Sequence, residues 1–189
     1  RCSGMFPSKQ SLFYQKHMCQ HMIPEMPRDW MRKVQNVFLI RHPARVLASF
    51  ARKYETPVLA DIGFVQQAEL FDETANHLGA PPFVVDSYDI RQNPGQMLQS
   101  LCTALGIART EKMLNWPAGG HSDDGVWAAH WYGAVHRSNG FAGPEGPLPT
   151  LSGRYAEMVE EALPYYERLK VFSLSADDFA SRSDANAAH

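Results

Sequence analysis

The chain carries an arginine and a serine at a spacing that suits the binding of an anion. Arg41 directly follows Val37–Ile40, four apolar residues that are typical of a short strand buried on both faces of a parallel sheet. From Pro43 the apolar residues recur at helical spacing, so we expect a strand, a tight turn and a helix. Ser49 lies eight residues after Arg41, just over two helical turns along. A guanidinium, a hydroxyl and the amides of a helix N-terminus predict a phosphate site at the carboxyl end of the strand.

A lysine and two histidines precede this motif. A strand-like run at residues 11–16 ends at Lys16, His17 follows it directly, and His21 lies four residues further on. Imidazole suits a general base because its ordinary pKa lies near neutral pH, and a lysine can neutralise charge that develops during group transfer. Either histidine could instead have a purely structural role, as a hydrogen-bonded polar residue where a strand meets a loop. The choice of base stays open, and we favour His17 because it lies where the strand pattern ends.

The remaining sequence predicts alternating helices and strands. Gly79 and Gly106 are expected to end helices, and Asn93 is expected to cap one. The order of strand, helix and strand predicts parallel pairing through right-handed crossovers. The predicted elements are helices at 27–34, 64–78, 94–105 and 154–171, the last interrupted at Pro164, and a second buried strand at 82–86.

Composition narrows the class of protein. The chain has 189 residues, 44% of them hydrophobic and 20% charged, as in an ordinary globular protein. The net charge of −2 gives no overall attraction to nucleic acid or to a membrane, and no apolar run is long enough to span one. Three cysteines without metal-ligand spacing favour a cytoplasmic location. We expect one domain at 1–172 and a flexible tail at 173–189.

The arginine motif resembles a known nucleotide site. Arg-x-Pro, followed by Ser49 and an aromatic residue, is similar to the 3′-phosphate-binding strand and helix of sulfotransferases that use 3′-phosphoadenosine 5′-phosphosulfate (PAPS). The resemblance implies that Arg41 and Ser49 hold the 3′-phosphate. Lys16 and His17 resemble the Lys-x-His sequence of cytosolic sulfotransferases, whose histidine deprotonates the acceptor hydroxyl. Here the lysine and histidine are adjacent, so both His17 and His21 remain candidates for the base.

Two later segments extend the resemblance. Residues 86–107 are similar to the family's strand, Tyr-Glu-Asp loop and proline-initiated helix, with Ser87 where the family has tyrosine. Residues 116–141 resemble a largely uncharacterised sulfotransferase-like family, some members of which are labelled branched-chain aminotransferase-like. No lysine has the surroundings of a pyridoxal-phosphate site. In better-known sulfotransferases a C-terminal loop closes over the 3′-phosphate, a part that the resemblance gives to Arg137 and Ser138.

The resemblance implies an α/β fold: a P-loop NTPase-like three-layer sandwich with a central parallel sheet, here without its N-terminal strand and phosphate loop. It implies transfer of a sulfuryl group from PAPS, as co-substrate, to a hydroxyl or amine of a small-molecule acceptor, with no metal. Two alternatives stay open. One is a P-loop kinase-like phosphotransferase, with Asp86 as the candidate magnesium ligand, and the other is a non-catalytic nucleotide-binding relative.

Overall fold

The computed structural model describes residues 12–52, 54, 56–121, 124–126 and 132–176. Two compact units can be distinguished, one formed by residues 1–86 and 147–173 and the other by residues 87–146 and 174–189. The first unit contains the strands and the arginine motif. The second contains the histidine- and tryptophan-rich segment. In the described residues, no helix combines the length and apolar character that a membrane span requires.

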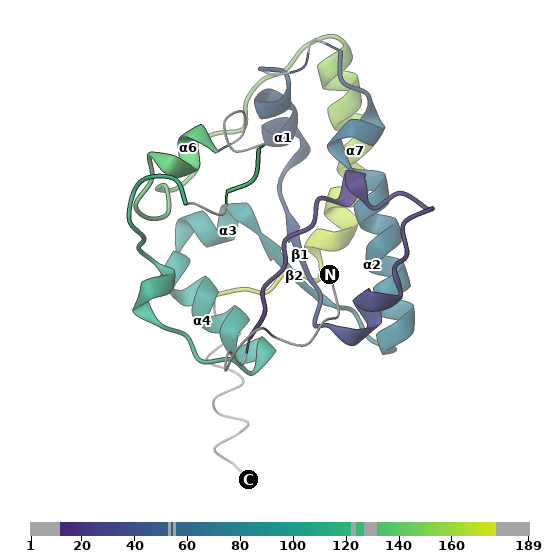
Figure 1. The fold of residues 1–189 in the computed structure, drawn as a ribbon. Coiled ribbons are helices and arrows are strands. Elements are labelled where there is room, and N and C mark those ends of the chain that lie inside the picture. The colour runs from purple at the N-terminus through teal and green to yellow at the C-terminus, as the bar shows by residue number, and fades with distance from the viewer. Residues whose placement is uncertain (1–11, 53, 55, 122–123, 127–131, 177–189) are drawn as a thin grey trace. The chain divides into compact units, whose positions relative to one another are not determined.

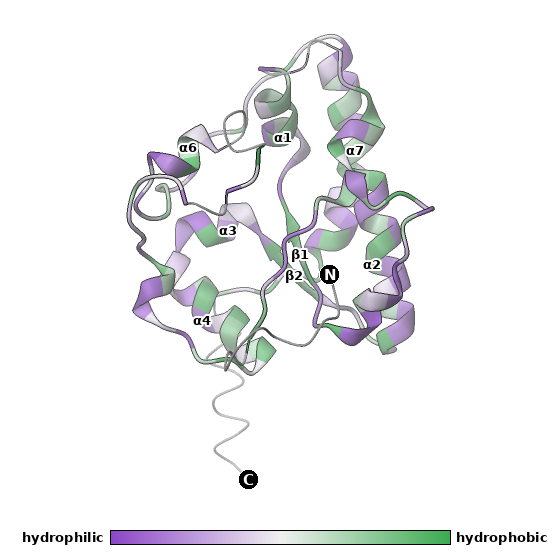
Figure 2. Ribbon diagram, viewed as in Figure 1, coloured by the Kyte–Doolittle hydropathy of each residue, from purple (hydrophilic) through white to green (hydrophobic). Residues whose placement is uncertain are grey.

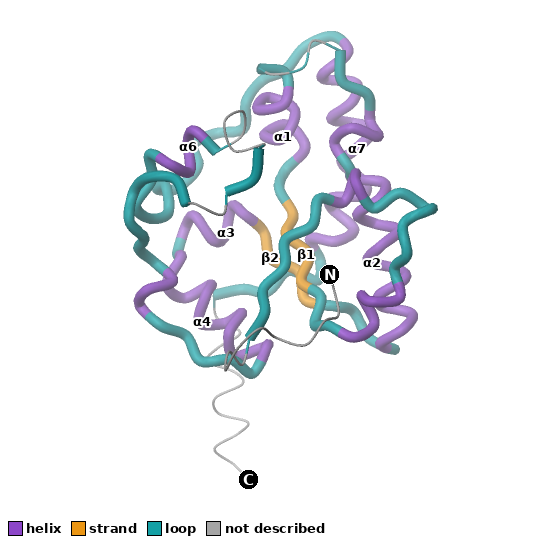
Figure 3. Tube along the Cα trace, viewed as in Figure 1, coloured by secondary structure: helices purple, strands orange, loops and turns teal. Residues whose placement is uncertain are grey.

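A parallel pair of strands forms the centre of the first unit. β1 (Val37–Ile40) pairs with β2 (Phe83–Asp86), and Ile40 stands opposite Asp86. The crossover between them contains α2 (Phe64–Leu78), which ends at Gly79 with φ +68°. Ser173 adds an isolated parallel bridge to Val84. The predicted α/β class and parallel crossover are confirmed, and Figure 3 shows the two short strands in orange.

Helices α2 and α7 (Arg154–Lys170) cover one face of these strands. They pack beside each other, as the ribbon in Figure 1 shows, and α7 also contacts β1. Phe71 of α2 meets Phe38 of β1 edge to face. Alternate residues of β1, Phe38 and Ile40, enter the core, and Figure 2 shows that α7 mixes hydrophobic and hydrophilic residues along its length. The core cluster consists of Met22, Phe38, Ile40, Ala68, Leu70, Phe71, Val84 and Leu169.

The other face of β1 is open. Val37 and Leu39 point away from the core cluster, and Leu39 is 55% exposed. The prediction that β1 is buried on both faces was therefore wrong. The alternation of exposed and buried residues is that of a strand covered on one side, because α2 and α7 both pack on the Phe38 face.

Irregular turns replace the predicted strand near the N-terminus. Residues 12–18 form no strand, so the predicted strand at 11–16 was wrong over its described part. An apolar run becomes a strand only where a neighbour offers hydrogen bonds, and in the described residues β1 pairs with β2 alone. Short 3₁₀ helices lie at η1 (Cys19–His21), η2 (Asp29–Lys33) and η3 (Leu59–Ile62).

The second unit begins where β2 ends. α3 (Ser87–Gln92) follows β2 directly, so the loop expected there was wrong. α4 (Pro94–Leu105) has the predicted ends: the Asn93 side chain accepts a hydrogen bond from the Gln96 amide, and Gly106 has φ +66°. The other short helices described in this unit are η4 (Glu111–Met113) and α6 (Gly133–His136).

Pro164 does not interrupt α7. The helix continues through it from Arg154 to Lys170. Proline costs a helix one hydrogen bond and causes crowding with the preceding turn. Packing outweighs this cost, since Met158 and Ala162 before the proline and Leu169 after it are all buried. The predicted interruption at Pro164 was wrong for this reason.

Candidate functional site

The turn after β1 consists of Arg41 and His42. β1 ends at Ile40 and α1 (Pro43–Phe50) begins two residues later. The His42 side chain caps this helix, because its Nδ1 accepts a hydrogen bond from the Ala44 amide at 3.2 Å. Pro43 needs no hydrogen bond at the first helical position. The predicted strand, turn and helix are confirmed, with a half-buried Arg41 at the carboxyl end of the strand.

A polar cluster lies at the end of β2. The Asp86 side chain is 1% exposed, and its Oδ2 accepts a hydrogen bond from the Tyr166 hydroxyl at 2.6 Å. The same oxygen lies 2.9 Å from Nζ of Lys170, one turn further along α7. The Tyr166 ring also meets the His42 imidazole edge to face, with 5.3 Å between ring centroids. These contacts connect the end of β2, α7 and the turn that carries Arg41.

The surroundings of His42 favour a neutral imidazole. Burial lowers the pKa of His42 below its ordinary value, and the nearby Arg45 guanidinium lowers it further. The Asp86 and Glu167 carboxylates raise the same pKa, with smaller effects. A neutral imidazole that accepts a hydrogen bond at Nδ1 carries its proton on Nε2. The bond from the Ala44 amide therefore assigns an N–H donor to Nε2.

Ser49 lies in the last turn of α1, on its exposed side. Arg45 precedes it by four residues, and positions four apart share a helix face. Leu47 is fully buried on the core side of the helix. The structure thus groups Ser49 with Arg45 along the helix surface, and Arg45 in turn lies close enough to His42 to affect its pKa.

His17 and Lys16 are exposed residues of the irregular N-terminal segment. The His17 ring packs against Trp30 of η2, with 4.6 Å between ring centroids. Its Nε2 lies 3.1 Å from Oε1 of Gln15. These contacts direct His17 toward η2, which packs on the carboxyl-terminal half of α2 through the ion pair between Arg28 and Glu73.

His21 ends η1, which is linked to β1 through one glutamine. Burial raises the pKa of the Cys19 thiol of η1, and the nearby Gln67 side chain lowers it by a smaller amount. The Gln67 side chain donates Nε2–H to the Leu39 carbonyl at 2.9 Å. Because Leu39 lies in the carboxyl half of β1, this chain of contacts connects η1 with the strand end that carries the arginine. His21 is itself exposed, and its role stays a prediction.

Arg137 and Ser138 lie in the second unit, directly after α6. Arg137 is exposed, whereas the Ser138 hydroxyl is engaged within its own segment. Oγ donates to the Val135 carbonyl at 2.6 Å and accepts from Nε1 of Trp116 at 3.0 Å. The hydroxyl proton of Ser138 is therefore committed to the backbone while this arrangement holds.

A second acid–base pair lies close by in the same unit. Nε2 of His136 is 2.9 Å from Oδ2 of Asp124, and that oxygen also accepts the His121 amide at 2.8 Å. The His121 amide and the His136 side chain hold the pKa of Asp124 below its ordinary value. Among the described residues, no three histidine, cysteine, aspartate or glutamate side chains are grouped as a metal site requires.

The comparisons with known proteins match most of this chain. A profile described as a sulfotransferase domain matches residues 4–173. The chain belongs to this sulfotransferase family. Two Arabidopsis thaliana proteins, named branched-chain-amino-acid aminotransferase-like protein 1 and 2, are 32% identical over 157 residues and 29% identical over 164 residues. These regions are 83% and 87% of this chain but 28% and 29% of the relatives, so the chain spans less than a third of their length. No solved structure matches it.

The match confirms the resemblance to the sulfotransferase superfamily. The matched region of this sulfotransferase domain contains Lys16, His21, Arg41, Ser49 and Arg137. Their individual roles remain predictions. The relatives' names refer to aminotransferases, whereas the domain matched by the profile is a sulfotransferase domain.

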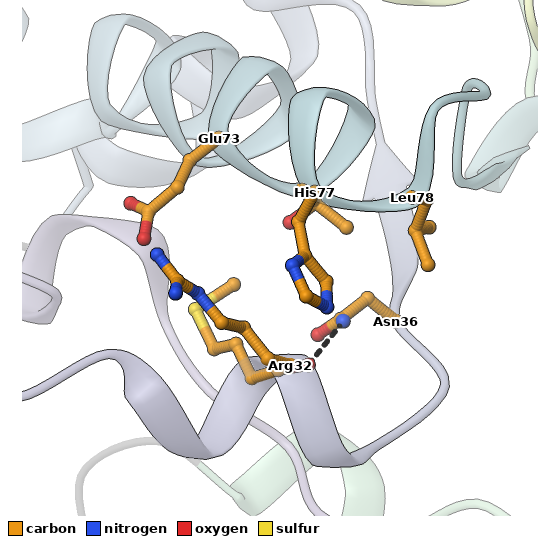
Figure 4. Close-up of a pocket in the computed structure, with 7 residues that line it drawn as sticks. Arg32, Asn36, Glu73, His77 and Leu78 are labelled. Atoms are coloured by element: carbon orange, nitrogen blue, oxygen red, sulfur yellow. Dashed lines mark hydrogen bonds between the residues drawn. The ribbon is translucent and has the colours of Figure 1, made fainter.

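Neither hollow found in the first unit contains one of the predicted site residues. The smaller one lies between η2 and the end of α2, where Arg32 and Asn36 face Glu73 and His77 (Figure 4). Its volume of about 10 Å³ is that of a single water molecule. The larger one, about 590 Å³ and open to solvent, lies at the ends of α2 and α7, beside Gly79 and Phe172.

Sequence reasoning missed three side chains of this region. The sequence motif assigns no role to His42, although an imidazole directly before a helix-starting proline suggests a helix cap. Tyr166 and Lys170 gave no local signal, because they lie 80 and 84 residues after their partner, Asp86. From sequence, Asp86 is predicted only as the magnesium ligand of the kinase-like alternative.

Proposed function

We propose that this protein is a PAPS-dependent sulfotransferase. The observation that supports it best is the Arg41 turn, which joins a parallel strand to a helix N-terminus within a matched sulfotransferase domain. A guanidinium beside helix amides suits a phosphate group. In this proposal Arg41 and Ser49 bind the 3′-phosphate of PAPS.

The reaction we propose is transfer of the sulfuryl group to a hydroxyl or amine of a small molecule. A histidine of the segment 16–21 removes the acceptor's proton while the new bond to sulfur forms, and the bond from sulfur to the phosphate oxygen breaks. Lys16 stabilises the charge that develops on that oxygen. The link from η1 through Gln67 to β1 supports His21 in this role.

The kinase-like alternative requires a carboxylate that is available to magnesium at a strand end. Asp86 stands at such an end, but its Oδ2 is engaged by the Lys170 ammonium and the Tyr166 hydroxyl. A cation already balances this carboxylate, which favours the sulfotransferase proposal. A nucleotide-binding relative without catalysis would share the Arg41 turn, so turnover is what separates it from an enzyme.

Thermal stabilisation by nucleotides tests the proposal. Adenosine 3′,5′-bisphosphate (PAP), the desulfated product of PAPS, should raise the melting temperature far more than adenosine 5′-phosphosulfate, which has no 3′-phosphate. The reason is that the proposed site binds the 3′-phosphate. Equal shifts with the two nucleotides would contradict the role of Arg41.

The choice of base has its own test. Replacing the catalytic histidine by alanine should abolish sulfuryl transfer from PAPS and leave PAP binding nearly unchanged. We expect this result for His21→Ala rather than for His17→Ala. Loss of transfer only in His17→Ala would restore the choice made from sequence. Full activity in both variants would exclude this segment as the source of the base.

A further inference from the structure

His42 presents one hydrogen-bond donor beside Arg41. Its Nδ1 is occupied by the Ala44 amide, so the neutral ring carries its proton on Nε2. Among the described residues, no acceptor lies within hydrogen-bonding distance of Nε2. The side chain is only half-buried, so a ligand can reach it.

We propose that Nε2–H of His42 donates a hydrogen bond to the phosphate that Arg41 binds, as a contact additional to Arg41 and Ser49. This inference rests on the proposed function and concerns the same site. The two residues are adjacent in the turn between β1 and α1, at the N-terminus of a capped helix. His42 would then serve twice, as the cap of α1 through Nδ1 and as a ligand contact through Nε2.

The surroundings hold the imidazole in place before a ligand arrives. The Tyr166 ring packs edge to face on His42, and the Tyr166 hydroxyl is fixed by Asp86 at 2.6 Å. Asp86 is itself buried and paired with Lys170 at 2.9 Å. A donor that is already positioned loses little entropy when it binds, which increases its contribution to affinity. Tyr166 is therefore a positioning residue, since it acts through His42.

The charges around the ring are consistent with a neutral donor. The charge of Arg45 on α1 lowers the pKa of His42, while the opposite charges of Asp86 on β2 and Glu167 on α7 raise it. Burial and Arg45 outweigh the two carboxylates, so the pKa of His42 is lowered and the ring stays neutral at pH 7.5. The positive charge at the phosphate then comes from arginine, and His42 adds direction rather than charge.

Two substitutions separate the two nitrogen atoms of His42. His42→Asn keeps an acceptor at the position of Nδ1, and asparagine is a preferred N-cap, but it lacks the distal donor. His42→Gln places an amide N–H near the position of Nε2 but lacks the capping acceptor. Titration calorimetry with PAP at pH 7.5, together with melting temperatures without ligand, should be measured for both variants and the wild type.

We expect His42→Asn to bind PAP about tenfold more weakly than wild type at an unchanged melting temperature. His42→Gln should bind within about threefold of wild type but melt roughly 3 °C lower because the cap is lost. Unchanged PAP affinity in His42→Asn would overturn the proposal. If the wild type itself fails to bind PAP, both the proposed function and the His42 contact are wrong.

Tyr166→Phe tests the positioning role. It retains the ring that packs on His42 and removes the hydroxyl that Asp86 holds. PAP affinity should fall about threefold in the wild-type background and not at all in the His42→Asn background, because the effect passes through Nε2. An equal loss in both backgrounds would show that Tyr166 acts by another route and would overturn this part of the inference.

Discussion

The two regions expected to bind the 3′-phosphate are built differently. In the first unit Arg41 lies in a turn between a strand covered on one face and a capped helix, and the exposed Ser49 hydroxyl has no hydrogen-bond partner among the described residues. In the second unit the Ser138 hydroxyl donates a hydrogen bond to the Val135 carbonyl and accepts one from Nε1 of Trp116. Both regions have an arginine and a serine, but they differ in whether the hydroxyl is left for a ligand.

This difference teaches that a motif gives residue types, whereas hydrogen-bonding capacity depends on the local fold. A serine hydroxyl has one proton to donate. Ser138 therefore cannot donate a hydrogen bond to a phosphate while it donates to the Val135 carbonyl. We infer that the proposed phosphate site consists of Arg41 and Ser49 of the first unit. The variants below test that inference, beginning with the largest expected effect.

Arg41→Ala should weaken PAP binding about a hundredfold, because a charge-assisted contact to phosphate is lost. Arg45→Ala should cost less, since Arg45 lies one turn into α1. Arg154→Ala, on an exposed surface of α7, is the matched control and should bind like wild type. Titration calorimetry measures all three. A larger loss in Arg45→Ala would mean that the phosphate lies along the Arg45–Ser49 face of the helix instead.

Lys170→Met should lower the free energy of unfolding by about 2 kcal/mol, since it leaves the buried Asp86 carboxylate without its cation. The partial exposure of Lys170 keeps the effect below that of a fully buried pair. Lys112→Met, at an exposed position of η4, should change little. Urea denaturation gives both values. If Lys170→Met were as stable as Lys112→Met, the ion pair between Asp86 and Lys170 would contribute nothing to the stability of the fold.

Ser138→Ala should lower the free energy of unfolding by about 1 kcal/mol and leave PAP affinity unchanged, because it removes two local hydrogen bonds. Ser49→Ala should do the reverse: stability stays within about 0.5 kcal/mol of wild type, and PAP binds about threefold more weakly. Denaturation and calorimetry on both variants complete the comparison. If Ser138→Ala lost affinity without losing stability, the two regions would be equivalent after all.

The smallest expected effect is a pH dependence due to His42. Burial and Arg45 lower its pKa in the folded protein below 6.5, so the unfolded chain binds more protons as the solution becomes acidic. The stabilisation is therefore fully present above pH 6.5 and is lost progressively as the pH falls from 6.5 through the lower pKa of the folded protein. The wild type should lose slightly more melting temperature than His42→Asn between pH 7.5 and 5.5. His77→Asn, at an exposed position, should follow the wild type.

Much of the fold was predictable because its signals are local. Gly79 and Gly106 ended helices with positive φ, Asn93 capped α4, and Pro43 began α1. Each of these effects involves residues within about one helical turn, so a sequence read in order contains the information. Pro164 is the counterexample, since the packing of α7 outweighed a strong local signal.

By itself, the sequence determined the α/β class, the strand, turn and helix around Arg41, and the family. Tertiary structure alone decided that Phe38 is covered while Leu39 is exposed, and that Asp86 meets side chains 80 and 84 residues away on α7. The physical reason is the distance along the chain over which each interaction acts. Capping and turn preferences act over a few residues, whereas the partner of a buried carboxylate depends on which distant helix packs beside the sheet.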